Sequence, residues 1–316
     1  MNTRTLGSSG ISVGEIGLGC MPMNWAYVGD SSETESIEVI HRALDLGATL
    51  LDTADVYGPF TNEELIGRAL RGHRHRAVLA TKTGLVAGPN GGYPLRNDAR
   101  PEHIREAIDG SLGRLRTDVI DLYQLHRIDP AVPLEESWGA MADLVGAGKV
   151  RALGLSEANV DELASAHAIH PVASVQSELS LWFTERLDDV VPWCAANDAA
   201  FIPFAPLGRG FLTGTVATAS TDPNDFRSSL PRFTEDAVQA NQVVVERVRT
   251  VADRHGATPA QIAIAWLLAQ AALIVPIPGT RRLRHLEDNA AAAFIRLSAE
   301  DLAELSDLPE VTGSRY

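Results

Sequence analysis

The chain has 316 residues, 45% hydrophobic and 22% charged, which is the composition of a globular protein with a sizeable core. With 27 basic and 41 acidic residues its net charge is −14 at pH 7, which argues against non-specific binding to nucleic acids or to an anionic membrane surface. Two cysteines, Cys20 and Cys194, are too few for a disulfide framework, and no apolar run approaches the length of a membrane span. The N-terminal segment has no apolar stretch typical of a secretory signal, so we expect a cytoplasmic protein.

Short apolar runs recur along the chain with amphipathic segments between them. Runs that are apolar on both faces are typical of parallel strands covered on both sides. The eight runs predicted as strands are Glu15–Gly19, Thr49–Ala54, Val78–Lys82, Val119–His126, Val150–Ser156, Val172–Ser177, Ala200–Ala205 and Leu273–Pro278.

The intervening segments have the start signals and the apolar spacing of helices. Ser32 with Glu35 forms a capping box that predicts a helix ended by Gly47, and Thr61 with Glu64 repeats the pattern. Pro101 begins a third helix, which has apolar residues at 3.6-residue spacing. Further helices are expected at Leu134–Ala147, Val160–His167, Leu187–Asn197, Gln239–His255, Pro259–Ala269, Leu283–Ala293 and Ser298–Leu308.

Eight strands alternating with helices indicate a parallel sheet. At this length the pattern favours one domain, residues 1–316, folded as a closed (β/α)8 TIM barrel, with an open doubly wound sheet as the competing arrangement. Arg4–Leu6 and Ile11–Val13 would form an N-terminal β-hairpin capping the barrel floor, and Ser298–Leu308 would be an extra C-terminal helix. The irregular stretch 208–234 is long enough to be a functional loop.

Chemistry in such barrels takes place where the strands end. Asp52 and Tyr57 lie at or after the end of the second strand, Lys82 ends the third and His126 ends the fourth. Lys82 is one of only two lysines in the chain, and its ammonium group would stabilise the Tyr57 phenolate and lower the pKa of that phenol. Asp52 would hold Lys82 charged, while His126 would donate a hydrogen bond to a carbonyl oxygen. The alternative is a structural Asp52–Lys82 ion pair that closes the barrel top.

Several other chemistries lack their motifs. The glycines at 208, 210 and 214 miss the spacing of a Rossmann fingerprint, and residues 154–158 lack the last glycine of a nucleophile elbow. No set of His, Cys, Asp and Glu completes a metal shell, so no metal is predicted.

In its motifs, the chain resembles the aldo-keto reductases, from about Thr3 to Asn289, and within them a bacterial branch that also resembles potassium-channel β-subunits. The residues that carry the resemblance are Leu51–Ala54 with Tyr57–Gly58, Ala80–Lys82, Arg100–Arg105, Asp121–His126, Gly154–Ser156, Val175–Ser177, Pro206–Gly214 and Ile277–Arg281. The resemblance implies a (β/α)8 barrel that binds NADP(H) and transfers hydride to a carbonyl, with Tyr57 as general acid, Lys82 and Asp52 tuning it and His126 orienting the substrate.

The resemblance also implies a cofactor site. Ser156 and Gln176 would hold the nicotinamide carboxamide, and Phe204 would stack on the ring. The pyrophosphate would lie along Leu207, Gly208, Arg209 and Gly210, and the 2′-phosphate and adenine would meet Gly279, Thr280, Arg281 and Asn289. Glu157 replaces an asparagine common in the family, so the contact with the carboxamide would be weaker, or would be made by the backbone or by Asn159. A solvated basic face is the alternative for residues 281–284.

The resemblance favours an NADPH-dependent reductase of a small-molecule aldehyde or ketone. A cofactor-binding regulatory protein of the channel-β type and a metal-dependent barrel hydrolase or lyase are the alternatives. Trp25, Trp182 and Phe183 are candidates for an aromatic substrate pocket, with packing in the core as the other interpretation. Neither a single substrate nor an oligomeric state follows from the sequence.

Overall fold

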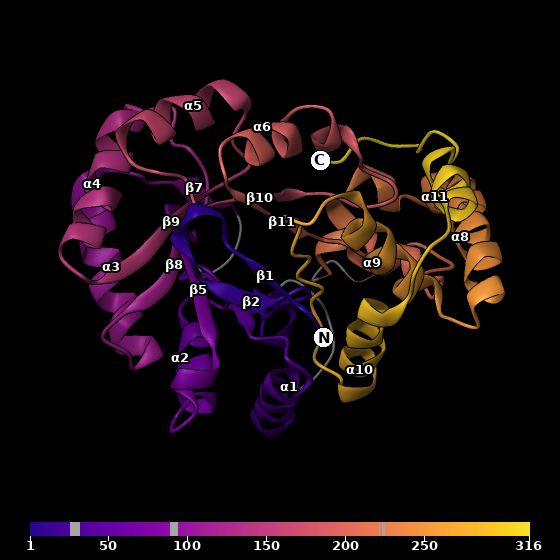
Figure 1. Ribbon diagram of the computed structural model, residues 1–316, viewed down its shortest axis with the longest axis horizontal. Helices are drawn as coiled ribbons and strands as arrows, with labels where there is room; N and C mark the ends of the chain where they lie inside the picture. The colour runs from indigo at the N-terminus through magenta and orange to yellow at the C-terminus, as the bar shows by residue number, and fades with distance from the viewer. Residues whose placement is uncertain (26–31, 89–93, 221, 223–224) are drawn as a thin grey trace.

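The computed structural model describes residues 1–25, 32–88, 94–220, 222 and 225–316. At its centre, seven strands pair in parallel in the order of the chain (Figure 1). They are β3 (Leu18–Gly19), β4 (Leu50–Asp52), β5 (Val78–Thr83), β8 (Ile120–Leu125), β9 (Val150–Ser156), β10 (Ser174–Glu178) and β11 (Ala200–Phe204). A doubly wound sheet would reverse its strand order at a switch point, whereas here each strand pairs with the next along the chain.

The eighth predicted strand closes the barrel without forming a regular ladder. On one side, Val275 N donates to Phe201 O and Ile277 N donates to Pro203 O. On the other side, Gly17 N donates to Pro276 O and Gly19 N donates to Pro278 O. Prolines 203, 276 and 278 carry no N–H, so the hydrogen bonds on both sides are interrupted. The expected (β/α)8 barrel is confirmed, with residues 273–279 in the position of its eighth strand.

Helices surround the barrel, with α1 to α5 on one side and α8 to α11 on the other (Figure 1). Their bounds are α1 (Glu33–Leu46), α2 (Thr61–Ala69), α3 (Pro101–Leu115), α4 (Leu134–Gly146), α5 (Val160–Ile169), α6 (Val190–Ala196), α7 (Glu235–Ala240), α8 (Gln242–His255), α9 (Pro259–Gln270), α10 (Leu283–Ala291) and α11 (Ala299–Ser306). The predicted segment 239–255 thus divides into α7 and α8, and α11 is the expected extra C-terminal helix. No helix in the described residues is long and apolar enough to cross a membrane.

Of the two predicted capping boxes, one forms and one does not. Ser32 accepts a hydrogen bond from Glu35 N and returns the reciprocal one, and Gly47 ends α1 at φ 86°. Thr61 is instead the first residue of α2 rather than its cap, and its hydroxyl donates to Gly58 O at 2.7 Å. The prediction for Thr61 was wrong because this hydroxyl is used by the loop that carries Tyr57.

The N-terminal hairpin, β1 (Thr3–Thr5) paired with β2 (Ser12–Gly14), covers one opening of the barrel (Figure 1). Its side chains Leu6, Ile11 and Val13 are buried among residues of the barrel interior, including Leu50 and Leu122. The expected hairpin floor is confirmed, which leaves the opposite end of the barrel for the site.

Two further segments border that opposite end. Residues 208–233 contain the short 3-10 turns η5 (Gly208–Thr213), η6 (Phe226–Ser229) and η7 (Pro231–Phe233). Residues 311–316 follow α11 and fold back toward β10, which Arg315 contacts at Glu178. The site described next lies between these segments and the strand ends.

Candidate active site

The residues expected to carry out catalysis meet at the carboxyl ends of β4, β5 and β8. Lys82 is fully buried, and its Nζ donates to Asp52 Oδ1 at 2.6 Å and to Thr53 O at 2.8 Å. Burial lowers the pKa of Lys82, but the charge and hydrogen bond of Asp52 outweigh burial, so that this pKa lies above its usual value. Lys82 therefore carries its positive charge inside the barrel.

Asp52 is held on its other oxygen as well. Its Oδ2 accepts from Gln176 Nε2 at 2.8 Å and from Gln124 Nε2 at 3.3 Å. Three donors thus hold the buried carboxylate of Asp52 in place. The sequence indicated Asp52 but not Gln124, whose side chain points into the barrel interior from β8.

Tyr57 lies within reach of the same ammonium group. Lys82 Nζ donates to the Tyr57 hydroxyl at 3.4 Å and lies 5.1 Å from the centre of its ring. Burial raises the pKa of Tyr57, and Lys82 lowers it by less, so that the pKa lies above 10. Lys82 thus lowers the phenol pKa as expected, but burial outweighs this effect in the protein alone. Tyr57 stays protonated at neutral pH, as a proton donor must.

His126 completes the group, with its ring 5.8 Å from that of Tyr57 in an edge-on arrangement. Burial lowers the pKa of His126 well below its usual value, and the charges of Lys82 and Arg127 add to the effect. The imidazole is thus neutral at pH 7. Its buried Nδ1 has no hydrogen-bond partner among the described residues. A neutral ring with one N–H can donate a hydrogen bond to a carbonyl oxygen and so orient the carbonyl group.

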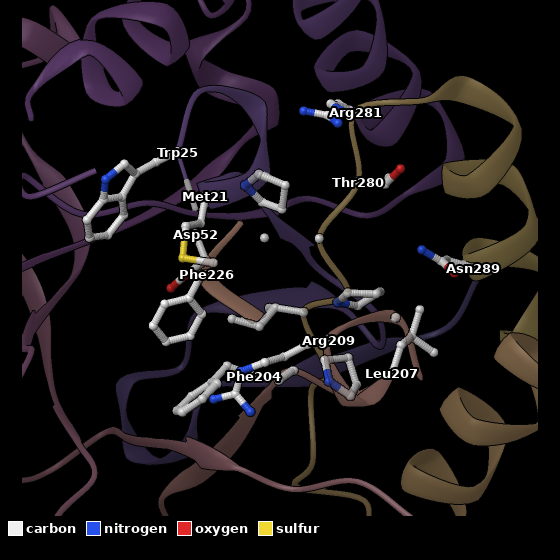
Figure 2. Close-up of a pocket in the computed structure, with 18 of the residues that line it drawn as sticks. Met21, Trp25, Asp52, Phe204, Leu207, Arg209, Phe226, Thr280, Arg281 and Asn289 are labelled. Carbon is white, nitrogen blue, oxygen red and sulfur yellow. The ribbon is translucent and has the colours of Figure 1, made fainter. Parts of the chain in front are cut away.

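A cavity of about 680 Å³ extends from these residues toward α10. Figure 2 shows Trp25, Met21 and Asp52 toward one end and Thr280, Arg281 and Asn289 toward the other. Its lining includes most of the predicted site residues: Trp25, Asp52, Tyr57, His126, Ser156, Gln176, Phe204, Leu207, Arg209, Gly210, Gly279, Thr280, Arg281 and Asn289.

Four predicted site residues do not line the cavity. Lys82 lies behind Asp52 and Tyr57. Trp182 is buried and stacks on Phe211 with ring centres 4.6 Å apart, and Phe183 is buried in the same core. Gly208 packs against Trp182, because a Cβ at residue 208 would come within 2.7 Å of the indole. The structure therefore places Trp182 and Phe183 where they pack and support the loop, not in the cavity.

The structure also brings residues into the cavity that the sequence analysis did not indicate. Near the catalytic end they are Met21, Leu85, Leu95, Arg127, Phe226 and Tyr316. Arg127 directly follows His126, so the strand-end rule could have included it. Phe226 and Tyr316 come from the long loop and the C-terminal segment, whose positions no local pattern predicts.

Near the expected nicotinamide site, the Glu157 side chain is bound away from the cavity. Ser156 Oγ lines the cavity and accepts from Arg127 Nη1 at 3.0 Å. Glu157 has φ 60° and is not among the lining residues, and its carboxylate binds Arg315 and Glu178 N. Asn159 caps α5 by accepting from Glu162 N, so it does not replace the family's asparagine in the cavity.

The residues at the other end suit a phosphate-bearing cofactor. Arg281, Arg282 and Arg284 line the cavity beside the first turn of α10, where cations and backbone N–H groups favour an anion. Gly279 is needed there, since a Cβ would come within 2.8 Å of Pro22. This donor set fits NADP(H). No group of three or more His, Cys, Asp or Glu in the described residues could hold a metal ion.

The fold and the site are those of a (β/α)8 barrel whose cavity is lined by a phenol and an imidazole beside a buried Asp–Lys ion pair. A model of the aldo/keto reductase family matches residues 15–310. A "Probable aldo-keto reductase 1" of Glycine max is 40% identical over 98% of this chain and 90% of its own length. The chain belongs to the aldo/keto reductase family.

Solved structures agree in fold. A glycerol dehydrogenase from Gluconobacter oxydans is 29% identical with a TM-score of 0.86, covering 96% of this chain and 94% of its own. An aldo-keto reductase from Klebsiella pneumoniae in complex with NADPH is 27% identical with a TM-score of 0.74 and the same coverage. The expectation of an NADP(H)-dependent oxidoreductase that reduces a small-molecule carbonyl compound is thereby confirmed, and the regulatory alternative is not favoured.

Proposed function

We propose that Tyr57 donates the proton in carbonyl reduction by this protein, with His126, Lys82 and Asp52 in supporting roles. The observation that carries the proposal is the chain Asp52–Lys82–Tyr57, in which a buried ammonium joins a fixed carboxylate to a phenol that lines the cavity. NADPH, when bound, supplies the hydride.

The phenol and the ammonium act together in this reaction. As the carbonyl oxygen gains electron density, Tyr57 gives it a proton, and the phenolate left behind lies next to the Lys82 cation. Asp52 keeps Lys82 charged without entering the reaction, because Gln124 and Gln176 hold it in place. His126 donates its single N–H to the carbonyl oxygen and stays neutral, so Tyr57 remains the proton source.

We assign the cofactor site to the lining residues at three places. Ser156, Gln176 and Phe204 would meet the nicotinamide, and Leu207, Arg209 and Gly210 the pyrophosphate, with Gly208 shaping that loop. Gly279, Thr280 and Arg281 would meet the 2′-phosphate, and Asn289 the adenine.

The substrate end of the cavity is mostly apolar. Trp25 packs against Tyr57 with ring centres 5.4 Å apart, and Met21, Leu85, Leu95 and Phe226 line the space beside them. These walls support aromatic or other largely apolar aldehydes and ketones as substrates. The proposal takes residues 1–316 as one working unit. The net charge of −14 argues against nucleic-acid partners, and two cysteines, too few for a disulfide framework, support a cytoplasmic role.

Replacing Tyr57 by phenylalanine tests the proposal. Tyr57→Phe removes the proton donor and keeps the ring, so kcat should fall by at least about 100-fold while NADPH still binds. Turnover is measured as loss of NADPH absorbance with a panel of aromatic and aliphatic aldehydes, and binding is measured by fluorescence.

Tyr123→Phe is the matched control, because Tyr123 is fully buried in the core outside the barrel interior and is absent from the lining. This variant should keep its turnover. Undiminished turnover in Tyr57→Phe would remove Tyr57 from the mechanism.

A further inference from the structure

Two carboxylates and two guanidinium groups form a buried charge cluster of Glu157, Glu178, Arg209 and Arg315. Arg315 Nη1 lies 2.6 Å from Glu157 Oε2, and Arg315 Nε lies 2.7 Å from Glu178 Oε2. Arg209 Nη2 lies 3.2 Å from the same Glu178 oxygen. The side chain of Glu178 is fully buried, and that of Arg315 is only 13% exposed. Charges this well shielded from water act on their surroundings more strongly than surface charges do.

The charge cluster lies directly behind the part of the cavity assigned to the nicotinamide. Glu157 follows Ser156, and Glu178 lies two residues beyond Gln176 at the end of β10. The Arg315 guanidinium lies 5.5 Å from the centre of the Phe204 ring, which lines the cavity. Glu157, Glu178 and Arg315 are not lining residues themselves, so their effect on a bound cofactor would be electrostatic rather than by contact.

Contacts other than those of Arg315 also hold the C-terminal segment. Thr312 exchanges two hydrogen bonds with the buried side chain of Asn241, at 2.9 and 3.0 Å. Arg232, which is also buried, donates to Gly313 O at 3.1 Å. These contacts hold the residues that precede Arg315, so a change of its charge can be tested with the segment still anchored.

The charge of Arg315 has a clear electrostatic role. Burial raises the pKa of Glu157, but Arg315 outweighs burial and holds this pKa below its usual value, so Glu157 is ionised. Without Arg315, Glu157 would lose its ion-pair partner and keep only the more distant charge of Arg127, while Glu178 would keep Arg209 and the charge of Arg232. The nicotinamide end of the cavity would then lose one buried positive charge.

We propose that Arg315 sets the relative affinity of the enzyme for NADPH and NADP⁺. The oxidised nicotinamide ring is cationic and the reduced ring is neutral, so an uncompensated carboxylate behind the ring would favour NADP⁺. By neutralising Glu157 and Glu178, Arg315 prevents tight retention of the oxidised product. The inference rests on the proposed cofactor site, and it adds a residue from the C-terminal segment to it.

The test compares charge changes of opposite sign. The dissociation constants of NADPH and NADP⁺ are measured by fluorescence titration and competition, without substrate, for the full chain and for R315Q, E157Q and R315Q/E157Q. We expect the ratio Kd(NADP⁺)/Kd(NADPH) to fall about three- to ten-fold in R315Q and to rise by a similar factor in E157Q. In the double variant the ratio should return close to that of the parent protein.

A merely structural role would give a different pattern. If R315Q and E157Q shift the ratio in the same direction, or leave it unchanged, the proposal is wrong, and the same holds if the double variant does not restore it. Should R315Q fail to fold, the rise expected in E157Q still decides the question, and a fall or an unchanged ratio in E157Q overturns the proposal. Arg254→Gln, which removes a partly exposed cation on α8, is the control and should leave the ratio unchanged. If the parent protein binds neither cofactor, the proposed function fails, and that result is distinct from an unchanged ratio.

Discussion

Asp55 is a buried acid in the loop between β4 and Tyr57. Burial raises its pKa to about 8, and the nearby charge of Glu63 adds to this. Asp55 therefore keeps its proton in the folded protein up to about pH 8 and loses it near pH 4 in the unfolded chain. Because the native state binds more protons between these values, the stability is greatest at low pH in this window and falls as the pH rises toward 8.

Asp55→Asn should remove this dependence. From pH 5 to pH 8, Asp55 alone should lower the free energy of unfolding by roughly 3 kcal/mol, and the variant should lack that decline. Urea unfolding at several pH values measures the difference. Parallel pH profiles for the two proteins would contradict the prediction.

His126 should have no visible titration over the working pH range. Its pKa lies well below the usual value because of burial and the charges of Lys82 and Arg127, so the ring is neutral through the neutral pH range. We expect kcat/KM for an aldehyde to be free of a His126 step between pH 6 and 8. An acidic limb in that range, lost in His126→Asn, would show that the histidine is protonated during turnover.

At the scale of elements, the cationic end of the cavity lies at the start of α10. Arg281→Gln should raise the Kd of NADPH about ten-fold or more, since a hydrogen bond to a charged group contributes about 1.5–3 kcal/mol. NADH lacks the 2′-phosphate and serves as the internal control, because its affinity should change little. Equal losses for both cofactors would place Arg281 away from the 2′-phosphate.

Elements whose pattern reflects their own burial could be predicted from the sequence, and elements shaped by distant partners could not. The strands were recognisable because both faces of each are covered, and Ser32 capped α1 because its partner Glu35 is local. Thr61 presents the same local pattern, but Gly58 O and Asn24 Nδ2 occupy its hydroxyl.

Site residues, too, could be predicted where they depend on strand ends and not where they depend on distant partners. Asp52, Tyr57 and His126 were predictable because strand ends converge in a barrel. Trp182 was misplaced because its partners Phe211 and Phe233 lie in a later loop. Arg315 gave no signal at all, since its two carboxylates lie more than a hundred residues earlier, Glu178 being 137 positions away.

At the scale of the whole molecule, stability and chemistry lie at opposite ends of the barrel. Leu6 of the hairpin is fully buried against the barrel interior. Leu6→Ala should lower the free energy of unfolding by about 2–5 kcal/mol through the cavity it leaves. Denaturant unfolding measures this loss, while kcat at 25 °C should stay close to that of the parent. A large drop in kcat for a variant that is still folded would show that the floor and the site are coupled.

The way the barrel closes has a consequence for how the chain folds. Arg4 of the hairpin donates to Ala271 O, 267 positions away along the chain. The backbone N–H groups of Gly17 and Gly19 donate to residues 276 and 278, in the position of the eighth strand. These contacts cannot form during synthesis until residues 271–278 have left the ribosome. Until then β3 and β11 are open edges, which are prone to pair with other chains. Ring closure between such distant segments is entropically slow, so the final step of folding should limit its rate and be the stage most exposed to aggregation.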